Sequence, residues 1–438
     1  MGAPPPAKLK SHCNYDDRLI GRSLWKKGPE RWFPEFNFWV DLPTKFEQCA
    51  PAVSDQNLKK EVLKEMTENK MEIMAPECGY HLNQIYFYLT QGCNLRCRHC
   101  WIAPKYQTEE TIWPSVDFEL FKDIISQGMD LGLSAVKLTG GEPLIHPHIE
   151  RILDHVNETG LALTVETNGV KCTPEIARKI VKNKKPFVSV SLDGADAATH
   201  EWVRGVPGCF DAAIAGVRNL VRAGLRPQII MSVMRRNADG MEAVVRLAEK
   251  ENAESVKFNL VTPTARGEQM QKSGETLSMK ELIDLGHWVE NTLEPSSELR
   301  IVYSHPTAFR PLSKIFTGPE GRCGIFGIIG VLGDGKYALC GIGETVPELV
   351  FGHAETDRLK DVWNNHPVLS DIRKGLPGDL KGICSDCLMK KMCLGSCVAM
   401  NYYRSKDLFA PHWYCEEAHN EGIFPAERIR PGSVSEYG

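Results

Sequence analysis

Between residues 85 and 261, short apolar runs alternate repeatedly with stretches that have the period of a helix, about 3.6 residues. Short runs rich in β-branched and aromatic residues have the composition of buried strands. Between them lie stretches whose apolar residues recur every three or four positions, as on one face of a helix. The clearest helical stretches are 117–129 and 209–223, and Thr173 followed by Pro174 has the form of a helix cap and first helical residue. The predicted strands are 85–89, 135–138, 162–166, 187–192, 229–234 and 256–261.

Six strand-to-helix steps in series predict a parallel sheet covered by helices, because strands this continuously apolar cannot face water. Six steps curl the sheet without closing an eight-stranded barrel. The expected fold class is therefore α/β, with a partial (β/α)6 TIM-like barrel. Functional residues should lie on the loops at the carboxyl ends of the strands, because such sheets bind their ligands there.

The chain on either side of this pattern is different. Residues 1–80 are an N-terminal extension with an aromatic cluster between Trp25 and Trp39, which either packs on a neighbouring domain or acts in substrate recognition or as a lid. The barrel is expected over residues 81–305. An irregular, Gly- and Cys-rich domain is expected over 306–425, and a solvated tail over 426–438.

Composition narrows the possible functions. The 438 residues include 52 Lys and Arg against 56 Asp and Glu, a formal charge of −4, so a protein that coats nucleic acid is excluded. No run approaches about 18 apolar residues, so no membrane span is expected. The first residues lack the apolar core of a signal peptide, and Pro6 stands where a myristoylation signal has Ser or Thr, which predicts a cytoplasmic protein. Fifteen cysteines are many for that reducing compartment, so their spacing was tested for metal sites.

Three cysteines, Cys93, Cys97 and Cys100, lie at CX3CX2C spacing directly after the first predicted strand. Three thiolates on a 4Fe-4S cubane leave one iron open to a small molecule, whereas a closed zinc or 4Fe-4S site needs four ligands. No fourth cysteine lies nearby in the sequence. The alternatives are a structural zinc site completed by His99 and three unrelated buried cysteines.

This motif, on the loop after the first strand of a partial βα barrel, resembles the radical S-adenosylmethionine superfamily. The resemblance implies that Cys93, Cys97 and Cys100 bind a 4Fe-4S cluster whose fourth iron takes the amino and carboxylate groups of S-adenosylmethionine. An electron passed to the sulfonium then yields methionine and a 5'-deoxyadenosyl radical that abstracts hydrogen from the substrate. An aromatic residue usually precedes the third cysteine. Here that place holds His99, whose imidazole can still cover the cluster.

Further matches follow the later strands and, by the same resemblance, contact S-adenosylmethionine. Residues 139–143 read TGGEP and resemble the element that holds the amino group of the cofactor. Glycine suits this place because the missing Cβ lets the main chain approach a ligand closely. Arg204 is a candidate clamp for a carboxylate, which a guanidinium binds bidentately, or else part of a surface ion pair. The predicted cofactor contacts are Gly140, Gly141, Glu142, Asn168, Ser189, Ser191, Asp193 and Arg204.

Seven more cysteines lie between positions 323 and 415, with a CX2CX5CX3C core. Their order resembles the SPASM domain, the C-terminal extension of peptide- and protein-modifying radical enzymes, which holds two auxiliary iron-sulfur clusters. By position, the outer cluster takes Cys384, Cys387, Cys393 and Cys415, and the nearer one takes Cys323, Cys340 and Cys397 with an unidentified fourth ligand. Two structural zincs are the alternative, since these spacings also suit zinc. The other cysteines are expected to pack in the core, although Cys78 could be recruited to a cluster: Cys13, Cys49, Cys78, Cys172 and Cys209.

The resemblance implies an oxidoreductase that acts on a peptide or protein substrate and takes electrons from a reductant such as flavodoxin or ferredoxin. The leading hypothesis is a maturase of ribosomally made peptides, for example by crosslink formation. Anaerobic sulfatase maturases share the cysteine layout, but they carry an aspartate after the equivalent of Cys340, where this chain has Gly341. A radical enzyme that acts on a tetrapyrrole or another small molecule is a further alternative. Outside the radical enzymes, the alternative is a non-catalytic zinc-binding protein. The sequence identifies no catalytic base.

Overall fold

The computed structural model describes residues 80–317 and 323–431, together with the strand pair at 32–33 and 38–39. The chain divides into two compact units, Met1–Ser54 and Asp55–Gly438. In the first unit, β1 (Trp32–Phe33) pairs antiparallel with β2 (Phe38–Trp39). The remaining expectations for the N-terminal extension, including Cys13, Cys49 and Cys78, lie outside the described residues.

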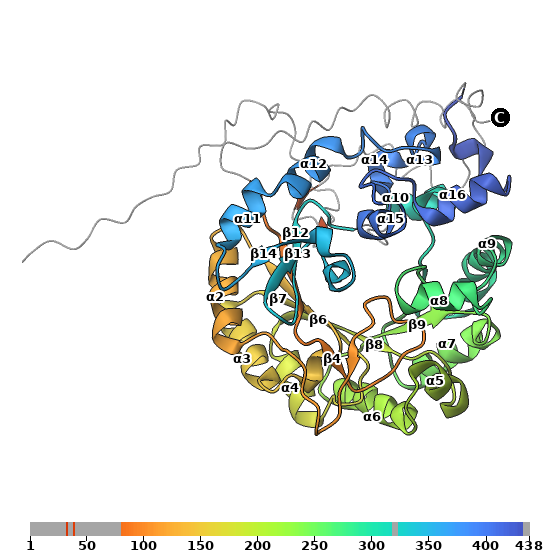
Figure 1. Ribbon diagram of the computed structural model, residues 1–438. Coiled ribbons are helices and arrows are strands. Elements are labelled where there is room, and N and C mark those ends of the chain that lie inside the picture. Colours follow the sequence, from red (N-terminus) through yellow and green to blue (C-terminus); the bar gives the residue numbers. More distant parts are fainter. Residues whose placement is uncertain (1–31, 34–37, 40–79, 318–322, 432–438) are drawn as a thin grey trace, which may run out of the picture. The chain divides into compact units, whose positions relative to one another are not determined.

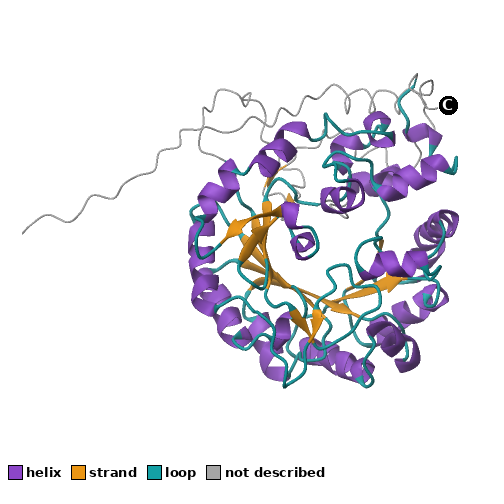
Figure 2. Cartoon of the chain, viewed as in Figure 1, coloured by secondary structure: helices purple, strands orange, loops and turns teal. Residues whose placement is uncertain are grey.

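The second unit is built on one ten-stranded sheet of order β11-β10-β9-β8-β7-β6-β3-β12-β13-β14. All neighbours from β11 to β12 are parallel, and the last two pairs are antiparallel. The helices form an arc outside the curved sheet, which does not close into a barrel (Figures 1 and 2). The strands are β3 (Gln84–Tyr88), β6 (Ala135–Thr139), β7 (Ala162–Thr167), β8 (Lys184–Ser191), β9 (Gln228–Val233), β10 (Ser255–Leu260), β11 (Arg300–Tyr303), β12 (Ile328–Val331), β13 (Lys336–Ala338) and β14 (Val350–His353).

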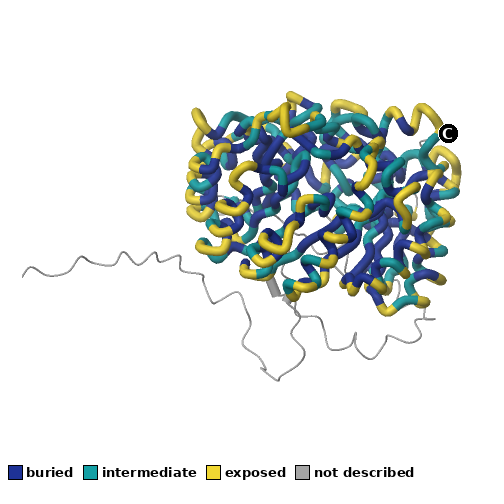
Figure 3. The backbone as a smooth tube through the Cα atoms, turned by 90° about the horizontal axis from the view of Figure 1, so that it is seen from below, coloured by how far each residue is buried: buried dark blue, intermediate teal, exposed yellow. Residues whose placement is uncertain are grey.

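Half of the helices of the barrel begin at a side chain that caps them. The Asp117 side chain accepts hydrogen bonds from the Glu119 and Leu120 amides, and Thr173 caps a helix whose first residue is Pro174. Buried residues run through the strands and inner helix faces, while exposed residues lie on the outer turns (Figure 3). The helices are α2 (Phe118–Met129), α3 (Ile149–Thr159), α4 (Pro174–Val181), α5 (Ala197–Arg204), α6 (Cys209–Arg222), α7 (Met241–Lys250), α8 (Arg266–Lys272) and α9 (Met279–Trp288).

All six predicted strands are confirmed, with ends displaced by at most three residues. The two clearest predicted helices are confirmed as α2 and α6, although Met129, the last residue of α2, is 48% exposed and lies off its apolar face. Two strands of the parallel sheet were not predicted. β11 adds a seventh strand after β10, and β12, from the Cys-rich region, pairs in parallel with β3.

The Cys-rich region therefore shares a sheet with the barrel, and it also contacts both ends of the helical arc. At one end α11 packs on α2, and the indole of Trp363 donates to the Tyr80 carbonyl at 2.8 Å. At the other end α16 packs on α9 (Figure 1). The predicted domain boundaries stay predictions. The helices of this region are α10 (Leu312–Thr317), α11 (Leu359–Asn365), α12 (Pro367–Gly375), α13 (Ile383–Asp386), α14 (Lys390–Cys393), α15 (Val398–Ser405) and α16 (Trp413–Asn420).

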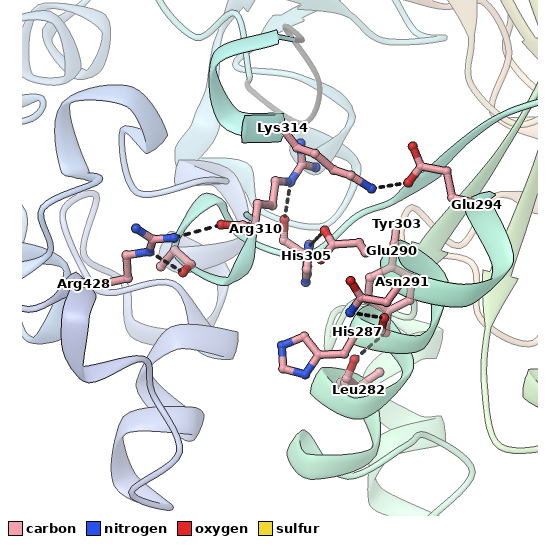
Figure 4. Close-up of polar contacts among 11 residues, drawn as sticks. Leu282, His287, Glu290, Asn291, Glu294, Tyr303, His305, Arg310, Lys314 and Arg428 are labelled. Carbon is pink, nitrogen blue, oxygen red and sulfur yellow. Dashed lines mark hydrogen bonds and ion pairs between the residues drawn. The ribbon is translucent and has the colours of Figure 1, made fainter. Parts of the chain in front are cut away.

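A buried polar network joins the last barrel strand to the C-terminal segment (Figure 4). The His305 ring contacts the Glu290 carboxylate at 3.0 Å, on a π-helical turn over Val289–Leu293 that continues α9. The Arg310 guanidinium donates to the His305 carbonyl. Arg428 donates to the carbonyls of Ala308 and Arg310 at 3.2 and 3.0 Å. These bonds satisfy backbone groups in the connection between β11 and the next α-helix, which is helical only over Thr307–Phe309, so they hold it in a defined position. Within the described ranges, no helix is both long and apolar enough to cross a bilayer.

Candidate functional site

The CX3CX2C loop follows β3 at the carboxyl edge of the sheet, where functional residues were expected. It contains the short strand β4 (Gly92–Cys93), which pairs in parallel with β5 (Lys105–Tyr106). The loop is also attached to the last turn of α5. The Arg96 amide donates to the Arg204 carbonyl, and the Arg98 amide donates to the Val203 carbonyl, both at 2.9 Å. Backbone hydrogen bonds to a helix that is distant in sequence thus fix the conformation of the loop.

The three thiols of this loop lie together and are largely buried. Burial raises the pKa of Cys93 well above its ordinary value, and the nearby Cys97 and Cys100 raise it further. Burial, together with Cys97, raises the pKa of Cys100 to about 11. The Cys93 sulfur accepts a hydrogen bond from the Leu95 amide at 3.4 Å. Because only the thiolates bind metal, such a site ionises on metal binding and releases protons.

The Cys97 sulfur accepts a hydrogen bond from one member of a buried ion pair. The Arg204 guanidinium contacts the Asp193 carboxylate, with 2.6 Å between Nε and Oδ2, and its Nη1 donates to Cys97 Sγ at 3.4 Å. Burial opposes ionisation of Asp193, but Arg204, with His99 and His200, keeps the pKa of this carboxyl below its usual range. Arg204 is therefore buried and already paired with a carboxylate of the chain. The alternative of a surface ion pair is excluded.

His99, which replaces the usual aromatic residue of the motif, is turned toward this ion pair. Burial lowers its pKa to about 4, with Arg204 and Arg266 lowering it and Asp193 opposing them. The ring is therefore neutral at pH 7. Its Nδ1 atom is buried and has no hydrogen-bond partner among the described residues, so it is open to a polar group of a bound ligand.

The Gly140-Gly141-Glu142 segment lies directly against the cysteine loop. A Cβ on Gly141 would come within 1.8 Å of the Gly92 carbonyl oxygen, so no other residue fits without displacing the loop. The buried carboxylate of Glu142 accepts hydrogen bonds from the Thr167 hydroxyl at 2.6 Å and the Asn168 amide at 2.7 Å. Burial still raises the Glu142 pKa to about 7. Glu142 therefore ties the end of β6 to the end of β7.

Asn168, Ser189 and Ser191, which were also predicted to contact the cofactor, have different partners in the structure. The Asn168 side chain donates to Asn94 of the cysteine loop at 2.8 Å. The hydroxyl of Ser189, in contrast, donates to the side chain of Gln228, the first residue of β9, at 3.3 Å, and Ser189 is the register partner of Glu166 on β7. Ser191 ends β8, and its register partner is Ile230.

A cleft of about 280 Å³ opens between the cysteine loop, the two glycines and the Cys-rich region. This volume is close to the lower end of the range of small-molecule sites. Of the predicted cofactor contacts, Gly140 and Gly141 line the cleft directly. Ala103, at the rim, has a φ of 47°, which is a strained value for a residue other than glycine. Glu344 and Thr345 form the opposite wall, and the Gln91 amide donates to Glu344 at 3.3 Å.

Glu344 was not identified from the sequence. Burial raises the pKa of its carboxyl group, and Asp334 raises it further. A carboxylate four residues after Cys340 is the sequence signal that could have indicated it, but only the turn over Gly341–Glu344 carries it to the cleft. A Cβ on Gly341 would lie 2.2 Å from the Tyr88 ring, so this ring occupies the space of any side chain at position 341.

Four cysteines of the Cys-rich region line the same small, apolar pocket. Burial raises the pKa of Cys384 to about 12 and that of Cys387 to about 11, and in both cases the neighbouring thiols add to the shift. The Met389 amide donates to Cys387 Sγ at 3.4 Å. The four residues are Cys384, Cys387, Cys393 and Cys415, the set predicted for the outer cluster.

A second group brings together Cys323, Cys340 and Cys397, which are far apart in sequence. Burial raises the pKa of Cys323 to about 12, and the nearby Cys397 raises it further. Burial also raises the pKa of Cys340, with Cys397 and Cys323 contributing. Lys137 lies near both Cys323 and Cys340, above the ring of Tyr86 at 4.4 Å, and pairs with Glu166 at 2.8 Å. The sequence did not indicate that this buried cation lies beside the second group.

These three groups fit iron-sulfur clusters. Within the described ranges, no three His, Cys, Asp or Glu side chains converge on a site for a single ion. The four thiols of the outer group line one pocket, and four soft sulfur ligands are the donor set of an iron-sulfur cluster. Amide and guanidinium donors at Cys93, Cys97 and Cys387 stabilise thiolate charge. The remaining described cysteines, Cys172 and Cys209, are buried in hydrophobic clusters as expected, and Cys209 packs beside Cys93 and Cys97.

Two family models match this chain. The model of the radical SAM superfamily matches residues 87–248, and that of the SPASM iron-sulfur cluster-binding domain matches residues 323–388. The AdoMet-dependent heme synthase of Methanosarcina barkeri (strain Fusaro / DSM 804) is 30% identical over 347 residues, which cover 76% of this chain and 95% of that protein.

More distant similarity extends to proteins with other names. The mycofactocin maturase MftC of Mycobacterium tuberculosis (strain ATCC 25618 / H37Rv) is 24% identical, with 78% of this chain and 85% of MftC covered. The crystal structure of Streptococcus suis SuiB bound to the precursor peptide SuiA superposes with a TM-score of 0.60 at 16% identity, covering 91% of this chain and 86% of SuiB. This last similarity concerns the fold.

Proposed function

Because the chain belongs to the radical SAM superfamily and carries a C-terminal SPASM domain, we propose that it oxidatively modifies a peptide substrate. A 4Fe-4S cluster and S-adenosylmethionine are the cofactors of the first domain, and the SPASM domain binds auxiliary iron-sulfur clusters. Bound together, the cluster and S-adenosylmethionine supply a 5'-deoxyadenosyl radical that removes a hydrogen atom from the substrate. The observation that carries the proposal is the arrangement of ten buried or half-buried cysteines in three groups, the first of which adjoins an open cleft.

In this proposal each cysteine group holds one cluster. Cys93, Cys97 and Cys100 hold the first, the four thiols of the outer group hold the outer auxiliary cluster, and the group around Cys397 holds the nearer one. The fourth ligand of the nearer cluster stays unassigned. All twelve described cysteines are free thiols, as metal binding in a reducing, cytoplasmic setting requires.

S-adenosylmethionine is proposed to occupy the cleft between the cysteine loop and Gly140-Gly141. The two glycines let backbone groups approach its methionine part, and the unpartnered Nδ1 of His99 offers a polar contact beside the loop. Glu142 and Arg204 act mainly through other residues: Glu142 orders the ends of β6 and β7, and Arg204 donates to Cys97. Glu344 is the candidate base, because its carboxylate lines the same cleft and burial raises its pKa.

Two relatives support a peptide as the substrate. SuiB has been crystallised with a precursor peptide, and MftC is named a maturase. A tetrapyrrole is the second candidate, favoured by the 30% identity with a heme synthase. Sulfatase-maturase chemistry with an aspartate at position 341 is disfavoured, because the Tyr88 ring fills that space.

The decisive experiment is metal analysis and S-adenosylmethionine cleavage by the anaerobically purified, dithionite-reduced protein. Three 4Fe-4S clusters correspond to about 12 irons per chain. We expect Cys93→Ala to lose about four irons and all 5'-deoxyadenosine formation, and Cys387→Ala to lose a similar amount of iron while some cleavage persists. Cys172→Ala, a buried cysteine outside the three groups, is the matched control and should keep both. Cleavage that survives Cys93→Ala, or zinc in place of iron, would contradict the proposal.

The substrate class is tested separately with the active protein. We expect 5'-deoxyadenosine formation to be stimulated by short peptides encoded beside its gene, with a mass change in the peptide. Stimulation by an iron porphyrin carrying propionate groups, with no response to peptides, would favour the tetrapyrrole instead.

A further inference from the structure

A half-buried tryptophan stacked between two exposed arginines lies beside the cysteine loop. Trp202 is in the last turn of α5, and the guanidinium carbons of Arg98 and Arg236 lie 4.3 and 4.8 Å from the centre of its ring. Arg98 Nε also donates to the Trp202 carbonyl at 2.9 Å. Trp202 is partly exposed, and both arginines are exposed. The stacking holds the two cations in defined positions on the surface.

Arg96 extends this surface along the same helix end. Its guanidinium stacks on the Tyr106 ring at 3.9 Å. A Cβ on Gly205, the residue that caps α5, would come within 3.1 Å of the Arg96 Cβ, so Arg96 lies against the helix end that carries Trp202. We call Arg96, Arg98, Trp202 and Arg236 the arginine face.

The charge of the arginine face is not neutralised by the described part of the chain. Arg235, the neighbour of Arg236, pairs with Glu281, but Arg96, Arg98 and Arg236 form no ion pair with a described carboxylate. Glu109 and Glu110, exposed on the adjoining loop, do not pair with them either. A local positive field on a chain whose net charge is −4 steers a partner to one place rather than to the whole surface.

The arginine face is also the outer surface of the first cysteine group. Arg96 and Arg98 flank Cys97 in sequence, and their amides bond to the last two carbonyls of α5. The last of these residues, Arg204, donates through its side chain to the Cys97 sulfur. A protein seated on this face would therefore be separated from the proposed cluster by little more than the loop itself.

We propose that the arginine face docks an acidic, one-electron carrier protein of the flavodoxin or ferredoxin type. This inference rests on the proposed function, because it assigns a partner to the same cysteine group. Acidic carboxylates of the carrier would pair with the three arginines, and Trp202 would supply an aromatic contact at the centre, as buried Trp and Arg residues do in protein interfaces. Small redox complexes of this kind bury little surface, so a few charges can dominate their affinity.

The test is titration of the full-length, cluster-loaded protein with oxidised flavodoxin at several salt concentrations, followed by calorimetry. We expect Arg98→Glu and Arg236→Glu each to weaken binding by about tenfold at low salt, and to make the salt dependence less steep. Arg236→Lys should retain most of the affinity. Arg222→Glu is the matched control, because this exposed arginine ends α6 at the opposite edge of the sheet, and its affinity should equal that of the wild type.

A second readout separates this inference from the proposed function. With dithionite, Arg236→Glu should form 5'-deoxyadenosine as fast as the wild type, whereas with reduced flavodoxin it should be slower in proportion to its weaker binding. Equal binding of flavodoxin by the Arg236→Glu and Arg222→Glu variants would overturn the docking site, as would the absence of binding to the wild type at low salt. If Arg236→Glu impaired binding of an acidic substrate peptide instead, the face would belong to the substrate and the inference would also be wrong. No 5'-deoxyadenosine with dithionite would overturn the proposed function alone.

Discussion

At the scale of single residues, the site depends on charges held away from water. Arg204 and Asp193 are both buried, and their contact at 2.6 Å lies directly behind the Cys97 sulfur. Such a pair need not stabilise the fold relative to apolar residues, but removal of one partner leaves an uncompensated buried charge. The pair therefore makes the position of Cys97 dependent on a residue 107 positions away in sequence.

We accordingly expect Arg204→Gln to lower the free energy of unfolding by about 3–5 kcal/mol, measured by denaturant titration of the anaerobically purified protein. The matched control is Arg235→Gln, which breaks an ion pair of similar length whose partners are both about half exposed. Its effect should be much smaller, because water screens exposed pairs. Equal losses of unfolding free energy in the two variants would show that the buried ion pair matters no more to stability than the exposed one.

Glu344 allows a test of the proposed base. Glu344→Gln should keep S-adenosylmethionine cleavage but reduce formation of the modified substrate by about 10²–10⁴-fold, the usual contribution of a general base. Because burial raises the pKa of Glu344, the basic form gains population only as the pH rises past the ordinary carboxylate range, so product formation should increase with pH there. In Glu344→Gln this pH step should be absent.

The control for this prediction is Glu348→Gln, because Glu348 is an exposed carboxylate four residues further along the chain. Product formation should be unchanged in that variant. Product analysis by mass spectrometry, with the substrate that stimulates cleavage most, decides the outcome. A Glu344→Gln protein with full product formation would remove Glu344 from the mechanism.

At the scale of elements, the site depends on close contact between two loops. Gly141 lies against Gly92 at the start of the cysteine loop, so the ends of β3 and β6 meet without side chains between them. This contact requires both the parallel register of the two strands and the absence of a Cβ at position 141.

We expect Gly141→Ala to push the cysteine loop outward and to reduce both iron incorporation and S-adenosylmethionine affinity. Overpacking of a tight contact costs about 1–3 kcal/mol or more, and here the added atom would overlap a backbone carbonyl. The control is Gly160→Ala, which also substitutes a glycine, with φ of 68°, but has open space around it. That variant should lose some stability and keep its iron, as measured by metal analysis and equilibrium dialysis with S-adenosylmethionine.

At the scale of the whole molecule, the two cysteine-bearing regions are not independent. β12 pairs with β3, the strand that leads into the cysteine loop, and the indole of Trp363 donates to the backbone of Tyr80 just before that strand. The hydrophobic core is continuous across both regions. The Cys-rich region thus covers the edge strand that the barrel would otherwise expose.

We therefore expect a chain ending at residue 317 to aggregate or remain unfolded. It would expose the unpaired edge of β3, whose Ile85 and Phe87 are fully buried in the intact chain. Size-exclusion chromatography and circular dichroism of the fragment are the measurements. A monomeric fragment with a cooperative thermal transition would show that the barrel folds without the C-terminal region.

The sequence alone predicted much of this protein because the relevant signals are local. The six strands are short apolar runs, the cap at Thr173 acts within three residues, and the cysteine spacings follow from how a loop wraps a cluster. The superfamily and its cofactors could be inferred for the same reason, since their motifs are contiguous segments at the ends of strands.

Only the tertiary structure decided which distant residues meet. It paired β12 with β3, placed Arg204 on Cys97, and carried Glu344 into the cleft beside Gly141. It also bonded the Ser189 hydroxyl to Gln228 on the neighbouring strand, a contact that no local motif indicated. The physical reason is that local patterns determine the direction of the chain over a few residues, whereas contacts across 100 or more positions depend on how whole elements pack into one core.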